Sequence, residues 1–138
     1  MTYKIVSKFI KDLSFEIPNS KSYFLLEKNI KNYKFVCDIK SKQIRPQIIQ
    51  VDVSLGLVSI DKSLSSNINI QVELTSLVQI DEKTEKKELE KIVLVKVPND
   101  IYPEIRGIIV YLFEKSGFNK INIDEKIDFL KLFESRKN

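Results

Sequence analysis

Residues 11–19 read Lys11-Asp12-Leu13-Ser14-Phe15-Glu16-Ile17-Pro18-Asn19. The apolar residues Leu13, Phe15 and Ile17 alternate with polar ones, so in an extended chain they fall on one face. Pro18 has no N–H to donate to a neighbouring strand. The stretch therefore predicts the end of a β-strand.

The same alternation is present from Tyr3 to Phe9. Phe9 and Leu13 are separated by an even number of positions, so we expect the apolar residues of both stretches to share one face of the strand. The intervals between the later apolar runs are polar and rich in turn residues, as is usual between strands of a sheet. Further strands are predicted at residues 35–39, 49–60 and 68–74, with a polar turn at residues 61–67.

After residue 80 the apolar spacing changes to that of helices. Residues 81–91 are almost wholly charged and predict a solvent-exposed helix, and residues 92–97 fit either its end or a strand. A longer helix is expected from Pro103 to Gly117, and a last one from Asn122, which could cap its first turn. Strands followed by helices indicate the α+β class.

Composition limits the class of protein. With 138 residues, 43% of them hydrophobic, the chain is expected to form one domain over residues 1–138. No apolar run approaches the ~20 residues that span a bilayer, and the N-terminus alternates like a strand, unlike a signal peptide. Cys37 is the one cysteine and cannot form an internal disulfide, so we expect a cytoplasmic protein without membrane insertion.

The chain has no histidine, which removes the commonest general base and the commonest zinc ligand. Cys37 alternates with Phe35 and Ile39 on an apolar face, so we expect a buried small side chain there, not a nucleophile. We therefore expect no catalytic residue, no metal site and no cofactor, and a protein that is not an enzyme.

The net charge of +4 is concentrated in residues 1–45, which carry ten Lys or Arg against four Asp or Glu. Lysines and aromatic residues are interspersed between Lys21 and Phe35. This pattern is compatible with binding to nucleic acid, but it favours a solvated connection anchored to the core by its aromatics. A basic nucleic-acid-binding module is therefore one alternative function.

Three stretches of the chain resemble the SecB family of bacterial protein-export chaperones. Residues 12–19 are similar to Asp-Ile-Ser-Phe-Glu-Ala-Pro-Asn in the family's first strand. The string Val97-Pro98-Asn99-Asp100-Ile101-Tyr102-Pro103 resembles the Pro-Asn-x-x-Phe-Pro that opens its long helix. Near the C-terminus, residues 127–130 resemble the family's Phe-Asp-x-Leu.

The resemblance implies a four-stranded antiparallel β-sheet with two C-terminal α-helices packed on one face, assembled as a dimer of dimers. It implies a holdase that needs no ATP and keeps unfolded preproteins competent for export by holding them in apolar grooves. By position, the groove residues are Tyr23, Phe24, Leu25, Leu26, Phe35, Cys37, Ile39, Phe129, Leu130 and Phe133.

The resemblance also implies docking on the export motor SecA through an acidic sheet surface, to which Asp12 and Glu16 would contribute. This chain departs from the family there: Asn69 and Gln71 stand near positions that carry an apolar and an acidic residue. Its overall charge is basic, and Lys28 replaces a groove aromatic. A SecB-like chaperone dedicated to one client, such as an antitoxin, is thus a second alternative.

Overall fold

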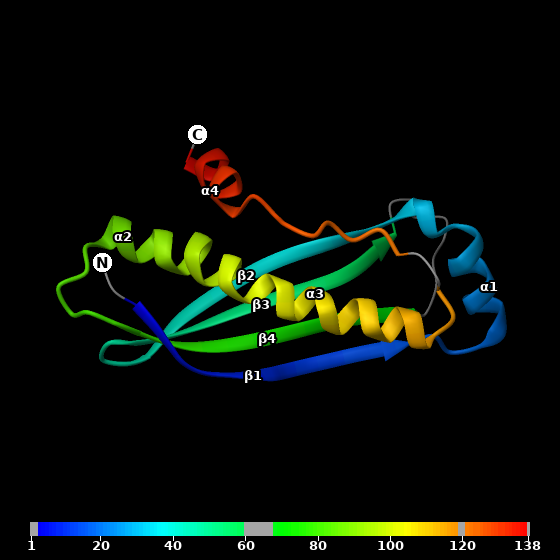
Figure 1. Cartoon of the computed structure of the whole chain (residues 1–138), viewed down its shortest axis with the longest axis horizontal. Coiled ribbons are helices and arrows are strands. Elements are labelled where there is room, and N and C mark those ends of the chain that lie inside the picture. Colours follow the sequence, from blue (N-terminus) through cyan, green and yellow to red (C-terminus); the bar gives the residue numbers. More distant parts are fainter. Residues whose placement is uncertain (1–2, 60–67, 119–120, 138) are drawn as a thin grey trace.

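The computed structural model describes residues 3–59, 68–118 and 121–137, and the predicted turn at 61–67 lies outside these ranges. Four antiparallel strands form one sheet in the order β1-β4-β3-β2, which confirms the expected four-stranded antiparallel sheet (Figure 1). The strands are β1 (Tyr3–Glu16), β2 (Tyr33–Arg45), β3 (Ile48–Ser59) and β4 (Asn69–Ile80).

The connection between β1 and β2 is helical, whereas no secondary structure was assigned to it from the sequence. It contains α1 (Ser20–Lys28) and the short 3₁₀ turn η1 (Ile30–Asn32). Asn19 caps α1, because its side-chain oxygen accepts a hydrogen bond from the backbone N–H of Ser22 at 2.8 Å. An asparagine directly after the strand-ending proline was the available sequence signal for this helix.

One continuous helical segment follows β4, and it starts later than predicted. It comprises α2 (Lys86–Lys91), the π-helical turn η3 (Ile92–Lys96) and α3 (Val97–Lys115). Pro103 lies inside α3 instead of opening it. Pro103 and Asn99 are both exposed, so water can satisfy the Asn99 carbonyl that proline leaves without a donor.

Gly117 ends α3 as predicted, with a left-handed φ of 90°. The N–H of Gly117 bonds to the carbonyl of Glu114 and the N–H of Phe118 to that of Phe113, which is the Schellman pattern. The rings of Phe113 and Phe118 lie 5.2 Å apart between centroids. This apolar contact accompanies the backbone bonds and directs the chain away from α3.

The last helix, α4 (Phe129–Lys137), begins at Phe129 and not near Asn122. Asp128 supplies the capping side chain, because its Oδ1 accepts a hydrogen bond from the N–H of Lys131 at 2.9 Å. The preceding segment is held along α3 by two long-range bonds. Tyr102 donates its hydroxyl to the Asp124 carbonyl at 2.6 Å, and Arg106 donates Nε–H to the Ile123 carbonyl at 3.1 Å.

The core lies between α3 and the central strands β3 and β4 (Figure 1). Ile101, Ile105, Ile109 and Phe113 recur at helical spacing on the buried side of α3. Burial of each such side chain contributes about 1.5–3 kcal/mol. The strand residues in this core are Ile49, Val51, Val53 and Leu55 of β3 and Ile70, Val72, Leu74 and Val78 of β4.

Two register shifts in β1 overturn the expectation that its apolar residues share one face. The pairing with β4 shifts between Ile5 and Ser7 and again between Ile10 and Asp12. Phe9 therefore pairs with Thr75 on the face of the sheet opposite the core, here called the outer face. Leu13 and Phe15 return to the core side, where they pair with core residues of β4.

Among the described residues, none of the helices has the length and apolar character required to cross a membrane.

Candidate functional site

The sequence-predicted groove residues lie in two groups. One group lines a small apolar cavity between β2 and α4, called here the β2–α4 hollow. Its volume of about 20 Å³ leaves room for about one water molecule. Cys37, Ile39, Phe129 and Phe133 were predicted, whereas Leu94 of η3 and Leu132 of α4 were not. The lining residues are Cys37, Ile39, Leu94, Phe129, Leu132 and Phe133.

The second group lies on α1, at one end of the sheet, while α4 lies on the β2 side (Figure 1). Phe24 is 63% exposed and Leu25 is also exposed, so both present apolar surface to solvent. Leu26 is fully buried and belongs to the core. Tyr23 is half-buried, with its ring 5.3 Å from that of Phe118. The four neighbours on α1 therefore differ in what they can contact.

A row of aromatic rings runs from α1 to Phe35 of β2, a predicted groove residue that belongs to neither group. Phe35 of β2 contacts Phe113 edge-on at 5.8 Å, and Phe113 in turn contacts Phe118. Phe118 contacts Tyr23, whose ring lies 5.8 Å from that of the exposed Phe24. Edge-to-face contacts of this kind add about 0.5–1.5 kcal/mol each beyond their buried area. The row thus fixes α1 against the core, and Leu130 on α4 remains exposed beyond it.

Cys37 is the polarizable member of the β2–α4 hollow. Burial raises the pKa of its thiol to about 11, with a further contribution from the charge of Asp38. At neutral pH the thiol is therefore protonated and a poor nucleophile. Its place in the apolar lining of the hollow, with Ile39 and Phe133, suits the small hydrophobic role that the sequence predicted.

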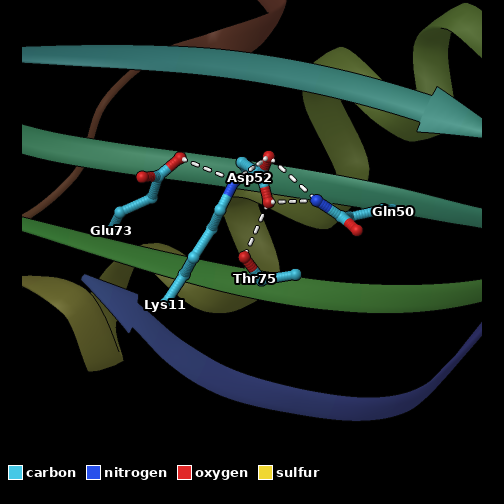
Figure 2. A network of polar contacts seen from close by, with 5 residues as sticks. All are labelled: Lys11, Gln50, Asp52, Glu73 and Thr75. Carbon is cyan, nitrogen blue, oxygen red and sulfur yellow. Dashed lines mark hydrogen bonds and ion pairs between the residues drawn. The ribbon is translucent and has the colours of Figure 1, made fainter.

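The outer face of the sheet carries a polar network that the sequence did not predict (Figure 2). Asp52 of β3 is only 7% exposed and accepts hydrogen bonds from Thr75 at 2.6 Å, Gln50 at 3.1 and 3.2 Å and Lys11 at 3.3 Å. Burial acts to raise the pKa of Asp52, but these hydrogen bonds and the Lys11 charge outweigh it and lower the pKa. The carboxylate is therefore ionised at neutral pH.

Asp12 and Glu16, the predicted docking carboxylates, are both exposed on the outer face. Glu16 pairs with Asn69, whose side-chain amide donates to Glu16 Oε1 at 3.1 Å. Asp12 pairs with Glu73, and the Lys11 ammonium lies 4.0 Å from Glu73 Oε2. Around Asp12, Glu16 and Glu73 the outer face is therefore acidic, and the charge of Lys11 partly offsets this.

Comparisons with known proteins identify relatives along the whole chain. The family model described as preprotein translocase subunit SecB matches residues 1–138. A protein of Pelagibacter ubique (strain HTCC1062), provisionally named protein-export protein SecB, is 39% identical over 137 residues, which are 99% of this chain and 97% of the relative. The protein-export protein SecB of Anaplasma marginale (strain Florida) is 23% identical over 144 residues, covering 96% of this chain and 81% of the relative.

A solved structure has a similar fold. It is a SecB-like chaperone of Mycobacterium tuberculosis in complex with a peptide from an antitoxin. The TM-score is 0.63 at 12% sequence identity, with 91% of this chain and 88% of the other covered. At this identity the likeness concerns the arrangement of strands and helices.

Proposed function

The chain belongs to the SecB family and is a chaperone of protein export, and from this premise we propose that it is a holdase that works without ATP. It binds apolar segments of unfolded preproteins and keeps them competent for translocation. Members of this family are chaperones and not enzymes, and we assign no catalytic residue to this chain. The proposal includes a single domain over residues 1–138 and a cytoplasmic location.

The observation that carries the proposal is the β2–α4 hollow beside a free strand edge. β2 is the last strand of the sheet, and within residues 3–59, 68–118 and 121–137 no backbone group bonds to its outer edge. An extended client segment that pairs with this edge places every second side chain toward the hollow. Pairing of this kind is tolerant of sequence, as a general holdase requires.

The hollow must widen to admit a client side chain, since it now holds about one water molecule. We propose that α4 moves to open it. α4 is short, and Leu130 and Leu132 are both exposed, so a limited part of its surface is buried. Client side chains then replace the contacts that Phe129 and Phe133 make across the hollow.

α1 provides a second contact for the same client. Phe24 and Leu25 present apolar side chains to solvent, while the buried Leu26 and the half-buried Tyr23 hold the helix in place. A long client that contacts both α1 and the hollow gains avidity without any strong single contact. Phe35, half-buried between the two groups, supports this continuous path.

Self-association as a dimer of dimers is the proposed assembly. β1 is the other edge of the sheet, and Val6, Ile10 and Leu13 on it are 45–49% exposed. Exposed apolar residues on an unpaired edge strand favour pairing with another chain. The proposal also places α3 and α4 on one face of the sheet, supported by the contacts of Phe113 with Phe35 and of Phe129 with Tyr102.

Docking on SecA through Asp12 and Glu16 is a further part of the proposal, supported by their exposure on the outer face. Nucleic-acid binding finds less support, because Lys34 lies on the outer face whereas Tyr33 and Phe35 point to the core side. A dedicated chaperone for one client, such as an antitoxin, is the second candidate, favoured by the peptide complex of the similar SecB-like structure.

Light scattering tests the general function. A denatured preprotein is diluted into increasing amounts of this chain, and aggregation is followed with time. Suppression that saturates at a few chains per client supports the holdase. An absence of suppression at large excess contradicts a general holdase and directs attention to a single dedicated client.

A further inference from the structure

The two faces of β2 differ in chemistry. On the core side, Phe35, Cys37 and Ile39 point toward the interior and the β2–α4 hollow. On the outer face, Lys34, Lys40 and Lys42 are all exposed. An extended segment paired with this edge therefore meets apolar side chains on one face and ammonium groups on the other.

The three lysines are not neutralised within the described parts of the chain, where none of them makes an ion pair. Asp52 lies directly across from Lys40 in the β2–β3 register, but its carboxylate faces Thr75 and Lys11 on the opposite side (Figure 2). Gln50, across from Lys42, also donates to Asp52. Asp38 is exposed on the same face between Lys34 and Lys40, so three lysines against one aspartate leave the outer face of β2 with a net positive charge.

Lysines on an edge strand disfavour pairing of that edge with a second copy of itself, because like charges come to lie close together. The same repulsion acts on any client strand with basic residues on its outer face. Asp or Glu residues at those client positions are instead attracted to the lysines. Side chains on one face repeat about every 6.6–6.8 Å along each strand. Carboxylates at two successive outward positions of a paired strand therefore stay in step with Lys40 and Lys42, which are successive on the outer face of β2.

We propose that the β2 edge prefers extended client segments with apolar residues on one face and Asp or Glu on the other. This inference rests on the proposed holdase function and names the client class of the same site. A client strand fits this edge better than a nucleic acid does. Val36 and Asp38 separate Lys34 from Lys40, and the outer face of β2 has no aromatic ring on which a base could stack.

Two short labelled peptides test the preference, with identical apolar residues at alternate positions and either Glu or Lys between them. Fluorescence anisotropy gives each Kd. We expect the Glu peptide to bind at least about tenfold more tightly, a ratio that falls as salt is added. The triple variant Lys34→Glu, Lys40→Glu and Lys42→Glu should reverse the order.

The matched control carries the same charge change on exposed lysines elsewhere: Lys83→Glu, Lys86→Glu and Lys87→Glu. It should keep the preference for the Glu peptide. Circular dichroism establishes that both triple variants are folded before their affinities are compared.

Equal binding of the two peptides, unchanged in the β2 triple variant, would overturn the charge preference and leave the holdase intact. Failure of both peptides to bind, by a chain that still suppresses preprotein aggregation in the light-scattering assay, would overturn the preference and leave the holdase intact. Failure in both assays would contradict the holdase and the preference with it. A third outcome is that a single-stranded oligonucleotide binds through the β2 lysines while the Glu peptide gains nothing. That result would overturn the proposal in favour of phosphate recognition.

Discussion

The Thr75 hydroxyl donates a hydrogen bond of 2.6 Å to Oδ1 of Asp52, and the two residues are paired across β3 and β4. Both are buried, although they lie on the outer face of the sheet. A carboxylate so enclosed is stable only while its donors remain in place. The pair therefore links the stability of the sheet to one hydroxyl group.

Replacement of Thr75 by valine keeps the shape of the side chain and removes the donor. We expect Thr75→Val to lower the free energy of unfolding by about 1–3 kcal/mol, because Asp52 loses its shortest hydrogen bond. Thr75→Ser keeps the hydroxyl and should lose clearly less. Urea unfolding of both variants measures the difference, and a larger loss in Thr75→Ser than in Thr75→Val would show that packing of the methyl group is what matters.

Acid should weaken the fold through Asp52. Its folded pKa is lowered because the hydrogen bonds from Thr75, Gln50 and Lys11 outweigh the effect of burial. The stabilisation is thus fully present above the unfolded pKa of about 3.9 and is lost as the pH falls through the lower folded value. Asp52→Asn should show a shallower loss of unfolding free energy below about pH 4 in urea titrations. The same pH slope in both proteins would contradict this assignment.

Much of the fold follows from local pattern. The alternation in β3 and β4 and the glycine that ends α3 were predicted because strand faces and left-handed helix ends are set by nearby residues. Phe9 was placed on the wrong face, since each bulge in β1 shifts the parity of the strand by one residue. The alternation itself carries no signal for such an insertion.

The candidate site was less accessible to sequence reasoning. Cys37 and Phe133 were nominated by resemblance, but Leu94 belongs to a π-helical turn whose type the sequence left open. In the alternation of residues 49–60, Asp52 lies opposite the apolar residues, on a face with no sequence signal for burial. Its burial depends on the cross-strand register with Thr75 and on the bulge that brings Lys11 to the same face, which are tertiary features.

Cys37 offers a reporter for opening of the β2–α4 hollow. Because burial raises its pKa to about 11, alkylation by iodoacetamide near pH 8 should be on the order of a hundredfold slower than in the urea-unfolded chain. Phe133→Ala should speed the reaction by loosening the hollow, and a bound client should slow it. A rate equal to that of the unfolded chain would show that the hollow is open.

Phe24 should matter for client capture, and Phe9 provides a matched control. Both rings are about half exposed or more, but Phe24 lies on α1 beside the aromatic row, whereas Phe9 lies on the outer face. We expect Phe24→Ala to raise the concentration for half-maximal suppression of aggregation by about tenfold, and Phe9→Ala to change it little. Equal effects of the two variants would contradict a client path over α1.

The acidic residues on the outer face should affect SecA and not clients. Asp12→Lys with Glu16→Lys replaces two exposed carboxylates of β1 by ammonium groups, so a docking partner of basic character is repelled. We expect SecA affinity, measured by calorimetry at low salt, to fall by about tenfold or more, with suppression of aggregation retained. Asp124→Lys with Glu125→Lys changes the charge equally at exposed positions outside β1 and should leave both unchanged. If the first pair of substitutions leaves SecA affinity as it was, the outer face is not the docking surface.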